Sequence, residues 1–195
     1  MYRANGPNAP RQIGSCVLVC LLHRIVVVTC RHVVASNIES VHLPMSTHLL
    51  SADGRWYFPT HADESVELDM AFLLLSPSRE DEIGKCSDPI PESAVCAGPV
   101  PSGSRVLVLG YPYSKRTVLR DKRAIGVRPF PIVSRASDRH SGDVGATATL
   151  QLPYHRVDKQ NPQRRFGPKL NGMSGCGIWV LGHDEQTSAS PVDLR

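Results

Sequence analysis

A chain of 195 residues, 41% of them hydrophobic, is long enough to bury a real core in one domain or in two small subdomains. Its charged fraction of 21% excludes wholesale disorder, and a formal charge of +4 permits an acidic partner without demanding one. The sequence has no apolar run of the roughly 18 residues that a membrane helix needs, and its first residues lack the arrangement of an export signal. We therefore expect a cytoplasmic protein with no membrane partner.

The first half of the chain predicts an arm followed by strands. Residues 1–13 are polar and contain glycine and proline, which predicts a flexible N-terminal arm. The runs 15–22 and 24–29 are rich in β-branched residues and are separated by a short polar break, so they predict a β-hairpin. Residues 54–58 and 66–75 are the next predicted strands.

A change of composition then divides the chain. Residues 76–104 contain five prolines, which argues against a helix or a central strand and marks a boundary between two halves. Strand patterns resume at residues 105–110, 124–133, 147–152 and 177–181. Because many short strands are separated by Gly and Pro turns, without convincing helical periodicity, we predict an all-β barrel or sandwich.

The six cysteines allow a disulfide framework, but the chain length and the missing export pattern favour reduced thiols. These cysteines are Cys16, Cys20, Cys30, Cys86, Cys96 and Cys176. Cys16, Cys20 and His23 have a loosely ligand-like spacing, but no second ligand pair follows at zinc-site spacing. We therefore expect neither a metal site nor a cofactor.

Three short segments combine the residue types that nucleophilic catalysis needs. His32 ends Val-Thr-Cys-Arg-His after an apolar strand, Asp69 heads the apolar run Leu-Asp-Met-Ala-Phe-Leu, and Ser174 lies within Asn-Gly-Met-Ser-Gly-Cys-Gly. Each segment alone has an ordinary structural explanation. Together they supply a nucleophile, a base that takes its proton and an acid that holds the base. Gly172 leaves the backbone before the serine free to aim N–H donors at a developing negative charge.

The order His, Asp, Ser and the motifs around them resemble the trypsin-like serine peptidases with the chymotrypsin fold, in their bacterial intracellular branch. The three segments are similar to that family's Thr-Ala-x-His, Asp-x-Ala-hydrophobic-Leu and Gly-x-Ser-Gly-Gly motifs, and Gly110-Tyr111-Pro112 is similar to its Gly-Tyr/Asn-Pro turn. The separations of 37 residues from His32 to Asp69 and of 105 from Asp69 to Ser174 suit that fold. The resemblance covers residues 14–195.

The resemblance implies two six-stranded antiparallel β-barrels with the active site between them. Residues 14–75 would form the first barrel, 76–104 the linker and 105–195 the second barrel. His32, Asp69 and Ser174 would form the triad of a serine endopeptidase acting on a protein or peptide substrate. The backbone N–H groups of Gly172 and Ser174 would form its oxyanion hole.

The sequence departs from the family pattern at four places. Met173 replaces the aspartate that pairs with a new N-terminus after zymogen cleavage, so we expect no activation by N-terminal trimming. Cys176 replaces a glycine, and an assembled triad would bring it near Cys30. Pro168, at the position of the pocket base, is not the acid that selects Lys or Arg. Only 21 residues follow Ser174, so we expect the second barrel to be incomplete at its C-terminal end.

Two other functions compete with an active peptidase. The first is a catalytically inactive pseudopeptidase that serves as a protein-binding module, which the short C-terminal part favours. The second is nucleic-acid binding, suggested by basic residues but by no recognition motif or interleaved aromatic residues, so we do not expect it. The basic residues are Lys115, Arg116, Arg120, Lys122, Arg123, Arg128, Arg164 and Arg165.

Overall fold

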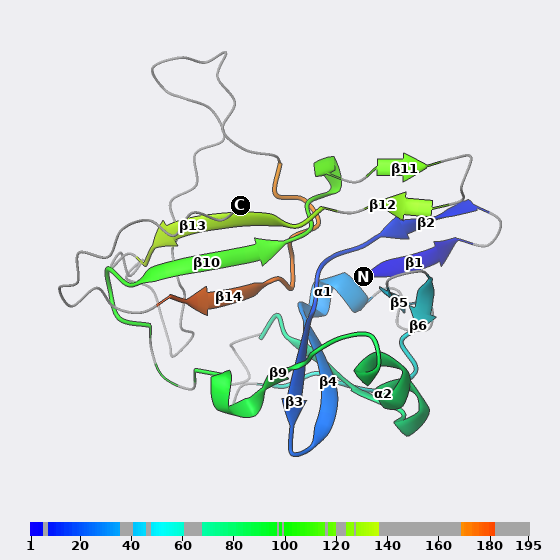
Figure 1. Cartoon of the computed structure of the whole chain (residues 1–195), viewed down its shortest axis with the longest axis horizontal. Coiled ribbons are helices and arrows are strands. Elements are labelled where there is room, and N and C mark those ends of the chain that lie inside the picture. The colour runs from blue at the N-terminus through cyan, green and yellow to red at the C-terminus, as the bar shows by residue number, and fades with distance from the viewer. Residues whose placement is uncertain are drawn as a thin grey trace, which may run out of the picture.

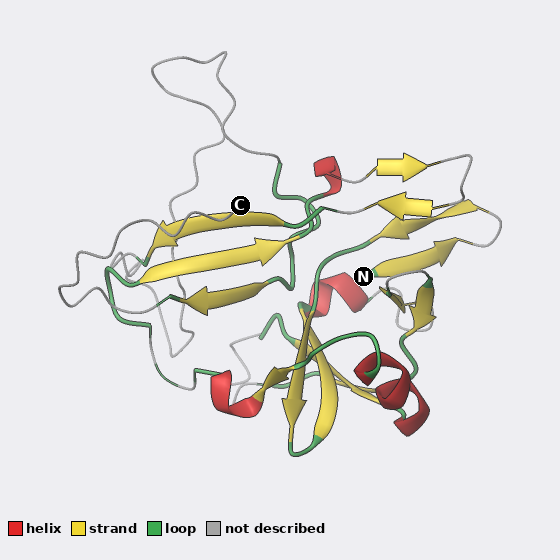
Figure 2. Cartoon of the chain, viewed as in Figure 1, coloured by secondary structure: helices red, strands yellow, loops and turns green. Residues whose placement is uncertain are grey.

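The computed structural model describes residues 1–5, 8–35, 41–45, 48–60, 68–96, 98, 100–115, 117–119, 124–126, 128–136 and 169–181. Strands occur throughout these residues and the helices are short, so the chain is mainly β, as predicted (Figure 2). The predicted strand 147–152 and the residues Arg116, Arg120, Lys122, Arg123, Arg164, Arg165 and Pro168 lie outside the described residues.

The largest sheet has five strands in the order β7-β8-β4-β3-β9, of which β3, β4 and β9 are labelled in Figure 1. Its strands are β3 (Val17–Leu21), β4 (Arg24–Thr29), β7 (Gly54–Tyr57), β8 (Ala71–Leu75) and β9 (Ile90–Pro91). Pairing is antiparallel except between β3 and β9. The predicted hairpin is confirmed, since β3 and β4 pair from Val17 opposite Val28 to Leu21 opposite Arg24.

Alternation along β8 explains how this sheet encloses a core. Ala71, Leu73 and Leu75 are buried, whereas the residues between them are partly exposed, because successive side chains of a strand point to opposite faces. Val27 on the neighbouring strand β4 is fully buried and belongs to the same core cluster. Burying a side chain of this size stabilises the fold by about 1.5–3 kcal/mol.

The first thirteen residues differ from the predicted flexible arm. They contain β1 (Tyr2–Asn5) and β2 (Asn8–Gln12), which pair with each other, and β1 also pairs with β5 (Val41–Pro44). Together with β6 (Leu49–Ser51) they form a four-stranded sheet in the order β2-β1-β5-β6. The prediction was wrong because the polar composition of this segment gives no sign that Tyr2 is buried or that β1 pairs with the distant strand β5.

A helix forms where the prolines argued against one. α2 (Pro77–Gly84) begins with Pro77 in its first turn, where the missing N–H has no helical partner to lose. Ile83 is fully buried in the core, and Arg24 of β4 donates to Glu80 Oε1 at 2.7 Å. The proline therefore starts the helix instead of preventing it, and tertiary packing holds it. The other helices are α1 (Arg31–Val34), η2 (Glu92–Ala94) and η3 (Tyr113–Lys115).

The second half of the chain supplies a separate three-stranded sheet in the order β13-β10-β14. Its strands are β10 (Arg105–Gly110), β13 (Phe130–Arg135) and β14 (Gly177–Val180). The predicted strand 124–133 is two elements, β12 (Ala124–Gly126), which pairs with β11 (Thr117–Leu119), and β13. In Figure 1, α1 lies just above the open end of the β3–β4 hairpin, to the right of this sheet.

The described strands fall into four sheets, and no closed barrel is found among them. The all-β class is therefore observed, whereas the two six-stranded barrels stay a prediction. No helix in the described part of the chain is long and apolar enough to cross a membrane.

The buried position of Tyr2 makes the N-terminal hairpin part of the folded unit. Tyr2 is only 2% exposed, so Tyr2→Ala is expected to lower the free energy of unfolding by on the order of 3 kcal/mol, measured by urea denaturation. Arg11→Ala, on the exposed side of the same hairpin, is the control and is expected to change stability by less than about 0.5 kcal/mol. If the two variants unfold at the same denaturant concentration, the N-terminal hairpin does not stabilise the folded unit, and the prediction of a flexible arm would stand.

Candidate functional site

Antiparallel pairing between β4 and β8 brings the histidine and aspartate segments together. Thr29, the last residue of β4, lies opposite Ala71, the first residue of β8. The chain leaving β4 and the chain entering β8 therefore share one edge of the sheet. His32 lies three residues beyond Thr29 on α1, and Asp69 lies two residues before Ala71. Strand register thus places side chains 37 residues apart in sequence at the same point.

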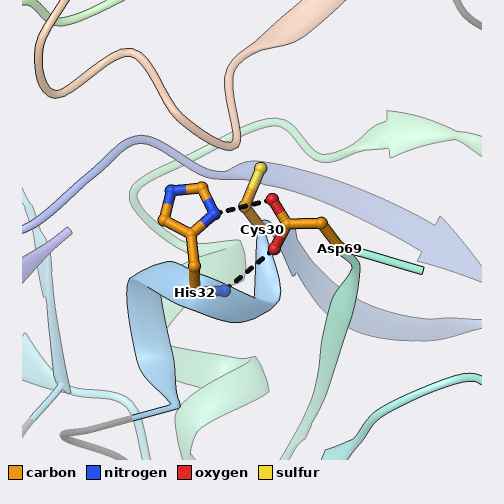
Figure 3. A group of neighbouring side chains, drawn as sticks. All are labelled: Cys30, His32 and Asp69. Atoms are coloured by element: carbon orange, nitrogen blue, oxygen red, sulfur yellow. Dashed lines mark hydrogen bonds and ion pairs between the residues drawn. The ribbon is translucent and has the colours of Figure 1, made fainter. Parts of the chain in front are cut away.

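His32 and Asp69 make two hydrogen bonds (Figure 3). The backbone N–H of His32 donates to Asp69 Oδ1 at 2.9 Å, and the ring Nδ1 lies 2.6 Å from Oδ2. An ionised carboxylate only accepts, so Nδ1 carries the proton in this pair. The other ring nitrogen of a neutral imidazole is then a free acceptor. The arrangement orients the ring for service as a general base through Nε2.

Asp69 is kept ionised to acid pH by this contact. Its partial burial raises the pKa of the carboxyl, but the hydrogen bonds from the His32 backbone and ring outweigh that effect and the pKa is lowered. The pair is therefore present above the ordinary aspartate range and is lost as the pH falls through the lowered pKa. The side chains of both residues are more than half exposed, which leaves the pair open to solvent and weakens it by screening.

The segment that carries Ser174 is a tight turn, which we call the serine loop (residues 170–176). The Met173 N–H donates to the Leu170 carbonyl at 3.0 Å, and the Cys176 N–H donates to the Met173 carbonyl at 2.9 Å. Gly172 and Gly175 have φ angles of 92° and 83°, in the left-handed region that glycine adopts most readily. The glycines on either side of Ser174 thus permit the two consecutive turns.

Ser15 ties this loop to the rest of the fold. Its hydroxyl donates to the Gly172 carbonyl at 2.9 Å and accepts from the Tyr111 N–H at 3.3 Å. Its backbone N–H donates to the Ser174 carbonyl at 2.8 Å, and its own carbonyl accepts from the Thr29 hydroxyl at 2.8 Å. One residue, only 2% exposed, therefore joins the serine loop, the Gly-Tyr-Pro turn and the end of β4.

Gly175 brings the serine loop into direct contact with the histidine segment. A Cβ on Gly175 would overlap the Thr29 hydroxyl and the Ser15 carbonyl oxygen, and would lie 3.1 Å from the Cys30 nitrogen. The residue after Ser174 therefore packs against the strand end that leads to His32. In Figure 3 the pale orange ribbon that includes this loop descends toward the Cys30 sulfur.

Met173 anchors the loop by burial. It is 6% exposed, and a Cβ on Gly110 would lie 2.9 Å from its Cε atom and 2.9 Å from the Cβ of Cys176. The glycine of the Gly-Tyr-Pro turn is therefore needed for close packing between the end of β10 and the serine loop. Apolar packing of Met173 therefore helps to hold the serine loop in place.

The structure brings the sequence-predicted residues into one region without joining all of them by hydrogen bonds. His32 and Asp69 are paired, and half-buried Ser174 lies on the loop docked beside them. No hydrogen bond joins the His32 ring to the Ser174 hydroxyl among the described residues. The N–H groups of Gly172 and Ser174, the predicted oxyanion donors, likewise make no hydrogen bond to another described residue.

Cys30 is the neighbour that the sequence did not assign to the site. Burial raises the pKa of its thiol, and the charge of Asp69 raises it further. Burial also raises the pKa of the Cys176 thiol, with a smaller contribution from Cys30, and the expected proximity of these two thiols stays a prediction. Both thiols therefore resist ionisation and are weak nucleophiles. None of the six cysteines forms a disulfide in the structure.

Comparison with known proteins identified no relative of this chain. No family model, no curated protein and no solved structure matches the chain.

The Ser15 hydroxyl is expected to stabilise the junction between the three segments. Ser15→Ala leaves the Gly172 carbonyl and the Tyr111 N–H without this partner in a buried site, so the free energy of unfolding should fall by about 1–3 kcal/mol. Guanidinium denaturation measures the change. Ser78→Ala, an exposed hydroxyl on α2, is the matched control and should be nearly neutral. If Ser15→Ala leaves the free energy of unfolding unchanged, the Ser15 hydroxyl does not stabilise this junction.

Gly175 is expected to tolerate no side chain. Gly175→Ala adds a Cβ that overlaps Thr29 and Ser15 at a φ of 83°, so a loss on the order of 3 kcal/mol is expected in thermal or chemical unfolding. Gly98→Ala is the control, because a Cβ there meets nothing within 4 Å. If the Gly175 and Gly98 variants unfold at the same denaturant concentration, the serine loop does not dock on β4 as described.

Proposed function

We propose that this chain is a serine-type endopeptidase that hydrolyses peptide bonds through His32, Asp69 and Ser174. The observation that carries the proposal is the docking of Gly175, next to Ser174, on the strand end that leads to the His32–Asp69 pair. The resemblance of the three motifs to the trypsin-like peptidases and their order along the chain support the same conclusion. A nucleophile, a base and an orienting acid are the set that the Ser-His-Asp mechanism of acyl transfer uses.

In the proposed reaction, the Ser174 hydroxyl oxygen attacks the peptide carbonyl carbon while its proton passes to His32 Nε2. Collapse of the tetrahedral intermediate breaks the C–N bond, and His32 returns the proton to the leaving amine. Water then hydrolyses the acyl ester through the same base. Asp69 holds the ring in the required tautomer, and its hydrogen bond to Nδ1 stabilises the imidazolium that forms.

The N–H groups of Gly172 and Ser174 would stabilise the negative charge on the carbonyl oxygen. The positive φ of Gly172 supports this assignment, because it turns the backbone in a way that other residues adopt less readily. A single oxyanion donor typically contributes about 10²–10³-fold in rate. Ser15, bonded to the Gly172 and Ser174 carbonyls, would hold the neighbouring peptide groups in place.

We further propose that the all-β fold is the chymotrypsin-like pair of six-stranded β-barrels. The five-stranded sheet carries the His32–Asp69 pair, and the three-stranded sheet, through β14, carries the serine loop. Two β-units that contribute different members of a triad to one site support this arrangement. Residues 14–75 would belong to the first barrel and residues 105–195 to the second. Because β9 pairs with β3, the linker 76–104 would also complete the first sheet.

A pseudopeptidase on the same scaffold is the second candidate. It is favoured by one observation, that no hydrogen bond joins His32 and Ser174 among the described residues. A protein-binding module needs the surface around the site but not the proton relay. The two candidates differ in whether the serine hydroxyl is activated.

A fluorophosphonate probe, which reacts covalently with activated serines, tests the proposal. The wild-type chain is expected to label at one residue, and Ser174→Ala is expected to abolish labelling. Asp69→Asn should slow it by about 10⁴-fold, since the histidine then takes the wrong tautomer. Ser78→Ala, an exposed serine outside the site, is the control and should label at the wild-type rate.

Peptide mapping of the labelled protein identifies the modified residue. Labelling that persists in the Ser174→Ala variant would contradict the assignment of the nucleophile. A folded wild-type chain that does not label at all would contradict the peptidase and favour the pseudopeptidase. Circular dichroism of each variant establishes that it is folded before its labelling is compared.

A further inference from the structure

Cys30, His32 and Asp69 present three different metal-ligating groups at one point (Figure 3). One ligand atom from each residue, a thiol sulfur, a ring nitrogen and a carboxylate oxygen, lies within 4.8 Å of the other two. The side chains of His32 and Asp69 are 58% and 53% exposed, so the cluster is open to solvent. It is the one such cluster found in the described residues, and the Cys16, Cys20 and His23 set suggested by spacing does not form one.

We propose that this cluster is a binding site for a thiophilic divalent cation of the zinc type. Zn²⁺ accepts sulfur from cysteine, nitrogen from histidine and oxygen from aspartate, commonly in a four-coordinate site with three protein ligands and water. A hard cation such as Mg²⁺ prefers oxygen ligands and is not suited to this set. The identity of the three groups therefore selects the class of metal.

The spacing of the ligands requires only a small adjustment. His32 Nδ1 and Asp69 Oδ2 lie 2.6 Å apart because they share a proton. Two ligands at about 2.0 Å from a tetrahedral metal lie about 3.3 Å apart, so replacing the proton by a metal widens the pair by about 0.7 Å. Exposed side chains can move this far without disturbing the core.

The charges of the cluster also suit a dication. Binding would release the Cys30 thiol proton to water, because a metal binds the thiolate form of cysteine. The Cys30 thiolate formed in this way would lie beside the Asp69 carboxylate, where the two negative charges repel each other unless a cation lies between them. A dication between them converts the repulsion into two attractive contacts and gives a site that is neutral overall.

Occupation of the site would regulate the proposed peptidase, and this consequence rests on the proposed function. A metal on Nδ1 replaces the His32–Asp69 hydrogen bond, and a metal on Nε2 occupies the nitrogen that would accept the Ser174 proton. Either geometry blocks general-base catalysis. Zinc would therefore act as a reversible inhibitor that a chelator removes.

Metal binding is tested by titrating the reduced full chain with Cd²⁺ and following thiolate-to-cadmium charge-transfer absorption, with Zn²⁺ added afterwards as a competitor. One Cd²⁺ site that Zn²⁺ displaces is expected. Cys30→Ser should remove its absorption, and Asp69→Asn should weaken Zn²⁺ binding by about 100-fold or more. Cys86→Ser is the control, because this exposed thiol lies outside the cluster and its loss should leave the site intact.

Binding that is unchanged in a folded Cys30→Ser variant, or the absence of any competed site, would overturn the metal proposal. Fluorophosphonate labelling with and without Zn²⁺ separates this result from the fate of the peptidase. If the protein binds metal but does not label, the metal site is retained and the peptidase is rejected. If the protein labels but does not bind metal, the peptidase is retained and the metal site is rejected. If both hold, Zn²⁺ should suppress labelling of the wild type, a chelator should restore it, and Cys30→Ser should label equally with and without Zn²⁺.

Discussion

The pairing of β4 with β8, with Thr29 opposite Ala71, is the constraint on which the candidate site depends. Strand side chains alternate between two faces, so a slip of one residue would turn the buried Ala71, Leu73 and Leu75 toward the opposite face. Core burial thereby specifies the register. The same register places Asp69 at the sheet edge where His32 emerges, so packing in the core sets the geometry of a surface pair.

A second constraint joins the two halves of the chain. The serine loop reaches the histidine segment through the bonds of Ser15 and through the close approach of Gly175 to Thr29. These contacts are buried, where an unmade hydrogen bond costs more than it does in water. Burial of Met173 against Gly110 adds apolar packing to the same junction. The loop is consequently held by the fold itself, through buried hydrogen bonds and apolar packing.

The residues under the candidate site are buried, whereas the side chains of the site itself are exposed. Ser15 and Thr29 are buried beneath it, whereas His32 and Asp69 are more than half exposed. Exposure leaves the ring and the carboxylate accessible from solvent. It also screens their mutual attraction, so the pair depends on its two hydrogen bonds for orientation more than on charge. Cys30 lies beside them, so a thiol, an imidazole and a carboxylate meet at the same point.

The sequence by itself determined the local elements whose pattern is strong. The β3–β4 hairpin, β8 and β10 follow from runs of apolar and β-branched residues, and His32, Asp69 and Ser174 are conspicuous because their motifs occur in a meaningful order. Tertiary structure decided the rest. Tyr2 pairs with His42 of β5, and Ile83 lies in a core cluster with residues of β4, β5 and β8, so neither the N-terminal hairpin nor α2 was recognisable from local composition.

Cys30 and Ser15 show the same limit within the site. Nothing in their neighbours along the chain distinguishes a cysteine that faces Asp69 or a serine that joins three segments. Their partners are Asp69, Tyr111 and Gly172, at separations that only folding removes. Sequence records which groups a chain possesses and which local conformations they favour. Their meeting depends on strand register and loop docking, which are properties of the whole fold.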